Sequence, residues 1–418
     1  MGLSLRSERR AAAVAFAYAA ALLLVFYLFL PSGGYTRIVE GKYACFLLLG
    51  GGFAAAAALT FPIGTGRPVS PLLPCAAAYL ACSALSALLS PYGAVVILGG
   101  PRREGLLTLA LCVLSFCLLA RALRPDRRLL YAAAAAVTLC DLLALVQTLG
   151  FDPFDLYPGA LTYLDGDRAY PGFYAGVSGN VDFTAFLLAL AACALAAALV
   201  RRRLWLLAPP LALTLFTLEQ LGVAAAWLGL ACAAVWSPAL LFPRRRRLCL
   251  SLSAALSLAA LGFLFFYSGA QPTLAELSRL LHGDTDPAFG SGRLAIWRQL
   301  PALVRERPLL GGGPDTLVLR GLIDFTWQRP DGVAVRSVIT SAHNEYLNIL
   351  VNQGALALAS YLALLLTALV RCFRRAAEAR FAVCGAALLC YGAMALVSVS
   401  SCVTAPYVWL LLALIACD

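Results

Sequence analysis

The chain has 418 residues, of which 62% are hydrophobic and only 13% are charged, and its mean hydropathy is +0.84. This composition excludes an ordinary soluble domain and indicates a polytopic membrane protein. The net charge of +11 could suggest a nucleic-acid binder, but the places where the arginines fall argue against one.

Twelve apolar runs are near the length needed to cross a hydrocarbon core of about 30 Å. They lie roughly at residues 11–30, 43–61, 72–90, 105–120, 129–149, 181–200, 204–218, 221–242, 248–268, 346–370, 381–399 and 402–417. The first run is long for a secretory signal and lacks a convincing cleavage site, so we interpret it as a retained helix. We therefore expect an all-α fold of about twelve transmembrane helices.

Three regions follow from these runs. Residues 1–268 would form spans one to nine, with an outer loop at 150–180. Residues 269–345 would form a large, partly helical extracytoplasmic loop between the ninth and tenth spans, and 346–418 would hold spans ten to twelve.

The arginines alternate between the two sides of the membrane once these spans are drawn. If the N-terminus is inside, the inner loops carry most of the cations and few acids, which is the positive-inside pattern. Those cations are Arg6, Arg9, Arg10, Arg67, Arg121, Arg124, Arg127, Arg128, Arg201 to Arg203, Arg244 to Arg247, Arg371, Arg374, Arg375 and Arg380. The pattern predicts a multi-pass protein of the cell membrane with both termini in the cytoplasm and no nucleic-acid partner.

The fourteen cysteines fall in or beside the apolar runs, and neither long outer segment contains one. Disulfide scaffolding is therefore not expected. Because there is no Cys-x-x-Cys pair and no Cys/His cluster, the sequence predicts neither a metal site nor a cofactor.

Several outer-facing charges stand out against this background. Arg102 and Arg103, followed by Glu104, lie in an outer turn, either as an interfacial anchor pair or as an anion contact at the mouth of a site. Arg168 is the only cation of the 150–180 loop. Asp141 is the one charge expected inside a span, where it could pair with an outer-facing arginine.

The large outer loop is rich in arginine on a side where arginine is otherwise scarce. Its stretch 291–300 predicts a short amphipathic helix with Arg293 and Trp297 one turn apart, and Pro301 should kink or restart that helix. His282, one of two histidines in the chain, is assigned no role.

The other histidine, His343, opens a polar stretch at the end of this loop. If that stretch is helical, Asn344, Asn348 and Asn352 recur every four residues and share one face. A polar stripe on a membrane helix can line a wet cavity near the membrane surface, or it can serve only as a cap and as interhelical hydrogen bonds.

Three segments together resemble the O-antigen ligase and O-antigen polymerase superfamily. They are the segment from Arg168 to Asn180, the segment from Arg293 through Trp297 to Pro308-Leu309-Leu310-Gly311, and Ala342-His343-Asn344-Glu345-Tyr346-Leu347 with Gly354. Twelve spans with a large outer loop between the ninth and tenth are also that family's architecture. One departure is that members often carry a Ser-Arg pair near the start of the eighth span, where this chain has Glu219-Gln220 without an arginine.

The resemblance implies transfer of a glycan from an undecaprenyl-pyrophosphate carrier to an acceptor hydroxyl of a lipid, a protein or a growing polysaccharide. The transfer would take place on the outer face of the membrane and would need no metal. It implies that His343 is the catalytic histidine, that Arg293 lies near the pyrophosphate and that Arg168 is a second phosphate contact. Arg103 or Arg298 would replace the missing arginine, and Asn344, Asn348, Asn180 and Trp297 would orient groups or line the cavity.

The residue types suit this chemistry. Arginines can stabilise the charge that grows on a departing pyrophosphate, and a histidine can take the proton from an acceptor hydroxyl. Ligase and polymerase remain alternatives, because they differ only in the acceptor. A lipid-linked sugar transporter would predict internal repeats and midplane charges. A structural scaffold would leave the outer arginines unexplained, and a peptidoglycan polymerase of the shape, elongation and division type would rely on an acidic residue in a large outer loop.

Overall fold

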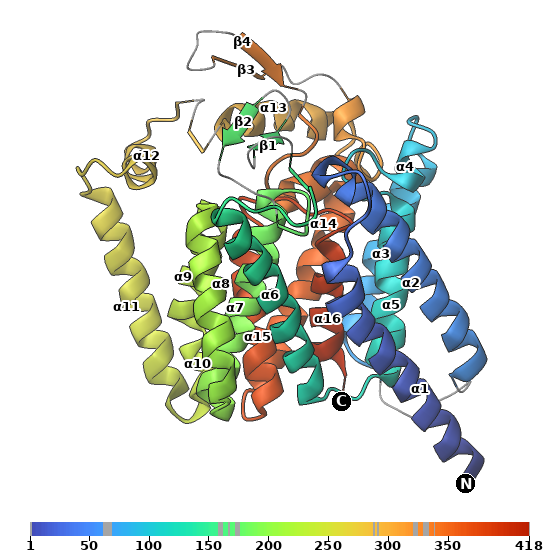
Figure 1. Cartoon of the computed structure of the whole chain (residues 1–418). Coiled ribbons are helices and arrows are strands. Elements are labelled where there is room, and N and C mark those ends of the chain that lie inside the picture. The colour runs from blue at the N-terminus through green and yellow to red at the C-terminus, as the bar shows by residue number, and fades with distance from the viewer. Residues whose placement is uncertain are drawn as a thin grey trace.

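The computed structural model shows a helical bundle with α12, α13 and two short hairpins gathered at one end (Figure 1). It describes residues 2–61, 69–157, 162–165, 168–171, 176–286, 289–290, 292–320, 325–328, 334–337 and 339–417, with backbone alone for residues 2–5 and for the strands. The helix α1 begins, and α16 ends, at the opposite end of the bundle (Figure 1).

The elements follow the predicted order. The helices are α1 (Gly2–Ala21), continued by the π-helix η1 (Leu22–Phe26), η2 (Tyr35–Arg37), α2 (Ile38–Thr60), α3 (Leu72–Leu88), α4 (Val95–Leu98), α5 (Leu106–Ala122), α6 (Arg127–Thr148), α7 (Val181–Arg202), η3 (Trp205–Leu207), α8 (Ala208–Leu221), α9 (Ala224–Trp236), α10 (Pro238–Leu241), η4 (Pro243–Arg245), α11 (Arg246–Phe265), α12 (Pro272–Leu281), α13 (Arg293–Glu306), η5 (Leu317–Leu319), α14 (Glu345–Arg374), α15 (Ala379–Met394) and α16 (Ala405–Ala416).

Each apolar run coincides with an apolar helix. Within the described ranges, six helices are long and apolar enough to cross a membrane, and a further six apolar helices are 10–17 residues long. The ninth of these is α11 and the tenth is α14, so the large loop falls where the sequence predicts it. The chain is a polytopic membrane protein by these criteria.

The expectation of a purely α-helical protein needs one correction. Strand β1 (Thr162–Asp165) pairs antiparallel with β2 (Arg168–Pro171), which sets Asp165 opposite Arg168. Strand β3 (Phe325–Gln328) pairs in the same way with β4 (Ala334–Ser337). Both hairpins lie in the two polar loops outside the bundle, where period-3.6 apolar patterning is absent.

The bundle is built around α14, α15 and α16. Helix α14 packs against α3, α15 against α7 and α9, and α16 against α5. In contrast, α11 lies at the edge of the bundle with little of its surface buried (Figure 1). The loop that carries the polar chemistry is therefore attached at one side by a peripheral helix and at the other by a central one.

Helix α14 is broken at Gly354, which has φ 86° and ψ 176°. A Cβ added there would lie 2.2 Å from the carbonyl oxygen of Leu309, so only glycine fits. The carbonyl of Pro308 accepts from the amide of Ala355 at 2.9 Å, and this contact ties the large loop to the break. The glycine at the end of the histidine stretch thus lets the loop dock against the helix.

Lys42 and Asp141 both lie buried inside the bundle, where the sequence predicts only Asp141 as a charge within a span. Asp141 accepts a hydrogen bond from the hydroxyl of Thr214 at 2.7 Å, so its recorded partner is a threonine rather than an arginine. Lys42, inside α2, is 1% exposed and donates to the carbonyls of Phe26 and Tyr27 at 2.7 and 2.8 Å. These carbonyls end the first helix, and a cation at a helix C-terminus satisfies them.

Candidate active site

The histidine of the polar stretch lies just outside α14 and not on it. His343 has φ +48°, a left-handed conformation that only a few per cent of non-glycine residues adopt. Asn344 is the N-cap, and its side-chain oxygen accepts from the amide of Leu347 at 3.0 Å. The helix therefore begins one residue after the cap, and the imidazole is held on a tight turn at its start.

This turn is held from several directions. The indole Nε1 of Trp297 on α13 donates to the carbonyl of Ala342 at 2.9 Å, and the side-chain oxygen of Asn348 accepts from the amide of Ala342 at 3.2 Å. The amide of Glu345 donates to the carbonyl of Ala395 at 2.8 Å. Trp297 and Asn348 thus position the residue next to His343, as orienting groups would.

Arg102 and Arg293 are the charged neighbours of this imidazole. Burial and the positive charges of Arg102 and Arg293 together lower the pKa of His343 to about 3, and burial is the largest cause. The imidazole is therefore neutral at neutral pH. An anion that neutralised the two guanidinium groups would raise its affinity for a proton.

Arg293 is the first residue of α13, which begins within the stretch 291–300 where the amphipathic pattern predicts a helix. Its Nη1 donates to the carbonyl of Gly290 at 2.7 Å. Burial lowers the pKa of Arg293, while the charge of Asp182 acts in the opposite direction. Asp182 stands in the first turn of α7, where Asn180 is the N-cap and its side-chain oxygen accepts from the amides of Asp182 and Phe183 at 2.8 and 3.4 Å. Helix α13 continues through Pro301 to Glu306 without a restart.

Arg102 is carried by the outer turn before α5, and a buried carboxylate holds that turn. Oδ2 of Asp315 accepts from the amide of Gly100 at 2.7 Å and from the amide of Glu104 at 3.2 Å, on either side of the arginine. The carbonyl of Arg102 accepts from the amide of Cys402 at 3.0 Å. Its guanidinium lies 5.7 Å from the centre of the Phe183 ring.

Two other predicted phosphate contacts, Arg103 and Arg298, have partners of their own. Arg103 makes a bidentate ion pair with Glu40, with Nη2 2.9 Å from Oε2. Arg298 is exposed and donates to Thr285. The side chain of Arg168 is outside the described residues. The structure therefore brings together His343, Arg293 and Arg102, and it pairs Arg103 and Arg298 with other groups.

The asparagine face lines a small internal cavity, as one reading of the repeat proposed. Asn348 and Asn352 border a space of about 30 Å³, which is room for one or two water molecules. Three carboxyl groups also border it, those of Glu104, Asp315 and Glu345. Burial, and after it the neighbouring charge of Asp315, raise the pKa of Glu104 to about 8.

From the sequence, we expect Arg103 or Arg298 to replace the missing arginine as a phosphate contact, whereas the charged neighbours of His343 are Arg102 and Arg293. The side chains of Arg102 and Arg103 leave one turn in different directions, and nothing in their sequence context distinguishes them. Glu104 and Asp315 were not predicted as site residues. Asp315 follows three glycines, two of which have positive φ, and this was the available sign of a tightly folded contact.

Comparison with known proteins agrees with these observations. Residues 209–362 match the family model described as O-Antigen ligase. The match begins in α8, crosses the whole outer loop with Arg293 and His343, and ends in α14, while Arg102 lies outside it. No curated protein matches the chain at a significant level. Residues 209–362 of this chain therefore form a domain of the O-antigen ligase family, whose members are membrane glycosyltransferases.

Proposed function

We propose that this protein transfers a glycan from an undecaprenyl-pyrophosphate carrier to an acceptor hydroxyl on the outer face of the cytoplasmic membrane. The observation that carries the proposal is one imidazole, held on a strained turn, with two guanidinium groups as its charged neighbours. The family supports a lipid-linked glycan as the substrate class.

In this proposal Arg102 and Arg293 bind the pyrophosphate. As the bond between the anomeric carbon and the phosphate oxygen breaks, negative charge grows on the leaving group, and fixed cations stabilise it. His343 accepts the proton of the acceptor hydroxyl as that oxygen attacks the anomeric carbon. Attack opposite the leaving group inverts the anomeric centre. We expect this transfer to need no metal.

The bound anion also explains how a buried imidazole beside two arginines can act as a base. Without a ligand, an imidazolium at position 343 would be disfavoured by burial and by both guanidinium groups. A pyrophosphate on the two arginines removes that repulsion. The donor is therefore expected to bind before the acceptor loses its proton.

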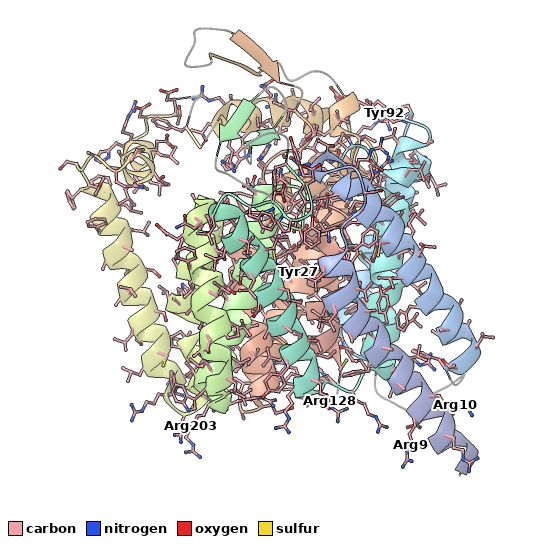
Figure 2. All side chains as sticks on the ribbon, in the orientation of Figure 1. Arg9, Arg10, Tyr27, Tyr92, Arg128 and Arg203 are labelled. Atoms are coloured by element: carbon pink, nitrogen blue, oxygen red, sulfur yellow. The ribbon has the colours of Figure 1, made fainter. Side chains whose placement is uncertain are left out.

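The orientation we propose places His343 outside the cell and both termini in the cytoplasm. Figure 2 shows Arg9, Arg10, Arg128 and Arg203 at the end of the bundle where α1 begins, far from Tyr92 near the opposite end. Arginines gathered at one end are expected on the cytoplasmic side. Reporter fusions to the C-terminus that are active only in the cytoplasm would test this orientation.

The test of the function uses the purified full chain in lipid nanodiscs with a lipid-linked oligosaccharide and candidate acceptors, in the presence of a chelator. We expect transfer by the parent protein and little by His343→Ala or Arg293→Ala. Arg305→Ala, an exposed arginine of α13, is the matched control and should match the parent. Full transfer by His343→Ala would remove the proposed base, and loss of parental transfer in chelator would contradict a metal-free reaction.

A polysaccharide polymerase of the same family is the second candidate. The same assay separates the two, because a polymerase yields a ladder of products from the lipid-linked substrate alone, and a ligase requires a distinct acceptor. A transporter is less well supported. The buried Lys42 closes a helix end, and Asp141 bonds a threonine, so both have structural explanations.

A further inference from the structure

Behind the turn of His343 lies a buried cavity lined by acidic groups from three parts of the chain. Glu104 precedes α5, Asp315 follows α13, and Glu345 is the first residue of α14, two residues after the histidine. Asn348 borders the same cavity, and its side chain bonds the amide of Ala342 beside His343. The turn of His343 therefore lies next to a cavity lined by three acids, and the charge of Arg102 acts on the imidazole and on two of these acids.

One oxygen of the Glu345 carboxylate accepts hydrogen bonds from described residues, and the other accepts none. Oε1 accepts from the hydroxyls of Tyr391 at 2.6 Å and Tyr361 at 3.0 Å. Oε2 is buried, and among the described residues it has no hydrogen-bond partner. The residue is 7% exposed and lines the cavity. A buried carboxylate oxygen without a donor is costly, and a proton or a water molecule would satisfy it.

The charges around the cavity are unbalanced. The titratable groups that face its acids are Tyr79 from α3, Cys112 from α5, Tyr346 and Tyr361 from α14, Tyr391 from α15, Cys402 before α16, and the cations Arg102 and Arg103 of the outer turn. Arg103 is already paired with Glu40. Three carboxylates cannot all remain ionised in such a space, so they must share protons as a coupled group.

We propose that this cavity is a proton-binding site, and that the open oxygen of Glu345 receives the proton that leaves the acceptor hydroxyl through His343. The step rests on the proposed function. The acceptor O–H bond breaks and its proton passes to the imidazole, while the new glycosidic bond forms and the pyrophosphate departs with the bond's electrons. A water molecule then carries the proton from the imidazole to the carboxylate of Glu345.

His343 needs such an outlet because it cannot keep the proton. Once the pyrophosphate leaves, the imidazolium again faces Arg102 and Arg293 in a buried place. The cavity offers the opposite environment, in which shared carboxyl groups bind protons more strongly than they do in water.

The first test measures the bound proton directly by infrared spectroscopy of the full chain in nanodiscs. At pH 7 we expect a C=O stretch from a protonated carboxyl group, which titrates near pH 8 and disappears in Glu104→Gln. Glu219→Gln, an exposed acid at the end of α8, should leave the band unchanged. If the parent has no such band, or if Glu104→Gln leaves its frequency and intensity unchanged, the cavity does not bind the proton. A band that shifts in Glu104→Gln would place the proton on Glu345 or Asp315 of the same cavity and would support the proposal.

The second test separates proton transfer from structural support. Glu345→Gln should lower kcat at least about tenfold, with the KM for the donor unchanged. A small proton carrier such as formate or imidazole should restore turnover in proportion to its concentration, and Glu345→Asp should recover part of it. A purely structural role would give lost turnover without buffer rescue.

The outcomes distinguish this proposal from the function on which it rests. Parental turnover in Glu345→Gln, or a loss that no buffer rescues, would overturn the proton outlet while leaving glycan transfer intact. A parent protein that shows the titrating band but transfers no glycan would overturn the function. Should Glu345→Gln fail to fold, the infrared test with Glu104→Gln still decides whether the cavity binds a proton.

Discussion

The arginines at the two ends of the bundle have different partners, although the residue type is the same. At the end where α1 begins, Arg201 donates to the carbonyls of Ala376 and Ala377, Arg371 to that of Ile415, and Arg380 to that of Cys417. Those carbonyls end or follow α14 and α16, so the cations cap helix C-termini.

At the opposite end, Arg102 and Arg293 act on a histidine instead. Their charges reach the imidazole of His343, and no helix C-terminus accounts for their position. The number of arginines at one end of the bundle therefore says little about function. What distinguishes the candidate site is a cation held beside a titratable group by buried neighbours such as Asp315.

Substitution of His343 should lower the rate of glycan transfer more than any other change. His343→Ala removes the proposed base, and we expect the rate of glycan transfer to fall by about a hundredfold or more. His282→Gln changes the only other histidine, whose Nδ1 donates to the carbonyl of Ser278 in α12, and it should have parental activity. Parental activity of both variants would show that His343 is not the base, and Arg102 and Arg293 would then have no titratable partner in the reaction.

The adjacent pair Arg102 and Arg103 provides the next test. Arg102→Ala should lower kcat/KM for the donor by about tenfold to a hundredfold, the range for a lost charge-assisted contact. Arg103→Ala breaks the ion pair with Glu40, and because that pair is half-exposed, transfer should change by no more than about threefold. The reverse ranking would show that Arg103, as first expected, is the phosphate contact.

The arginine pair also marks how far sequence reasoning could go. The apolar runs predicted the helices because length and hydropathy are properties of each segment alone. His343, Arg293 and Trp297 were found because they stand in recognisable motifs on one continuous loop. Arg102 and Asp315 could not be chosen, since their proximity depends on how the outer turn packs against a loop more than two hundred residues away.

The repeat of Asn344, Asn348 and Asn352 also shows what could not be predicted from the sequence, here within a single helix. Its spacing predicted a shared face, and two of its members do line the cavity. Asn344 is instead a cap, because the helix begins after it. Spacing alone cannot locate the first residue of a helix, and that one boundary decides whether His343 lies on the helix or on a turn.

A smaller but more direct effect concerns the charge of His343. In a His282→Gln background the chain has a single histidine, so labelled imidazole gives one NMR signal. Its pKa should lie well below 6.5, and Arg102→Gln should raise it because a like charge is removed. Inorganic pyrophosphate should raise it in the parent and less in Arg102→Gln. If the pKa of His343 is near 6.5 and changes neither in Arg102→Gln nor on addition of pyrophosphate, the charges of the arginines do not act on the imidazole.

The same pKa has a consequence for stability. Because the folded-state pKa of His343 lies below the unfolded value, the native protein binds fewer protons between about pH 6.5 and 3. This group's contribution to stability is present above pH 6.5 and is lost as the pH falls through that range. In Arg102→Gln the pH range over which this stability is lost should be shorter, because the folded-state pKa of His343 rises and the lower limit of the range rises with it.

The smallest effect is expected at the other end of the bundle. Arg371→Gln removes a cation that bonds the last carbonyls of α16, and we expect it to lower the free energy of unfolding by about 1 kcal/mol. Glycan transfer per folded molecule should stay at the parental rate, because this arginine only closes a helix end. Thermal unfolding and transfer measured on the same preparation would check both expectations. A loss of transfer with unchanged stability would mean that the two sets of arginines are coupled across the bundle, and the contrast between their roles would no longer hold.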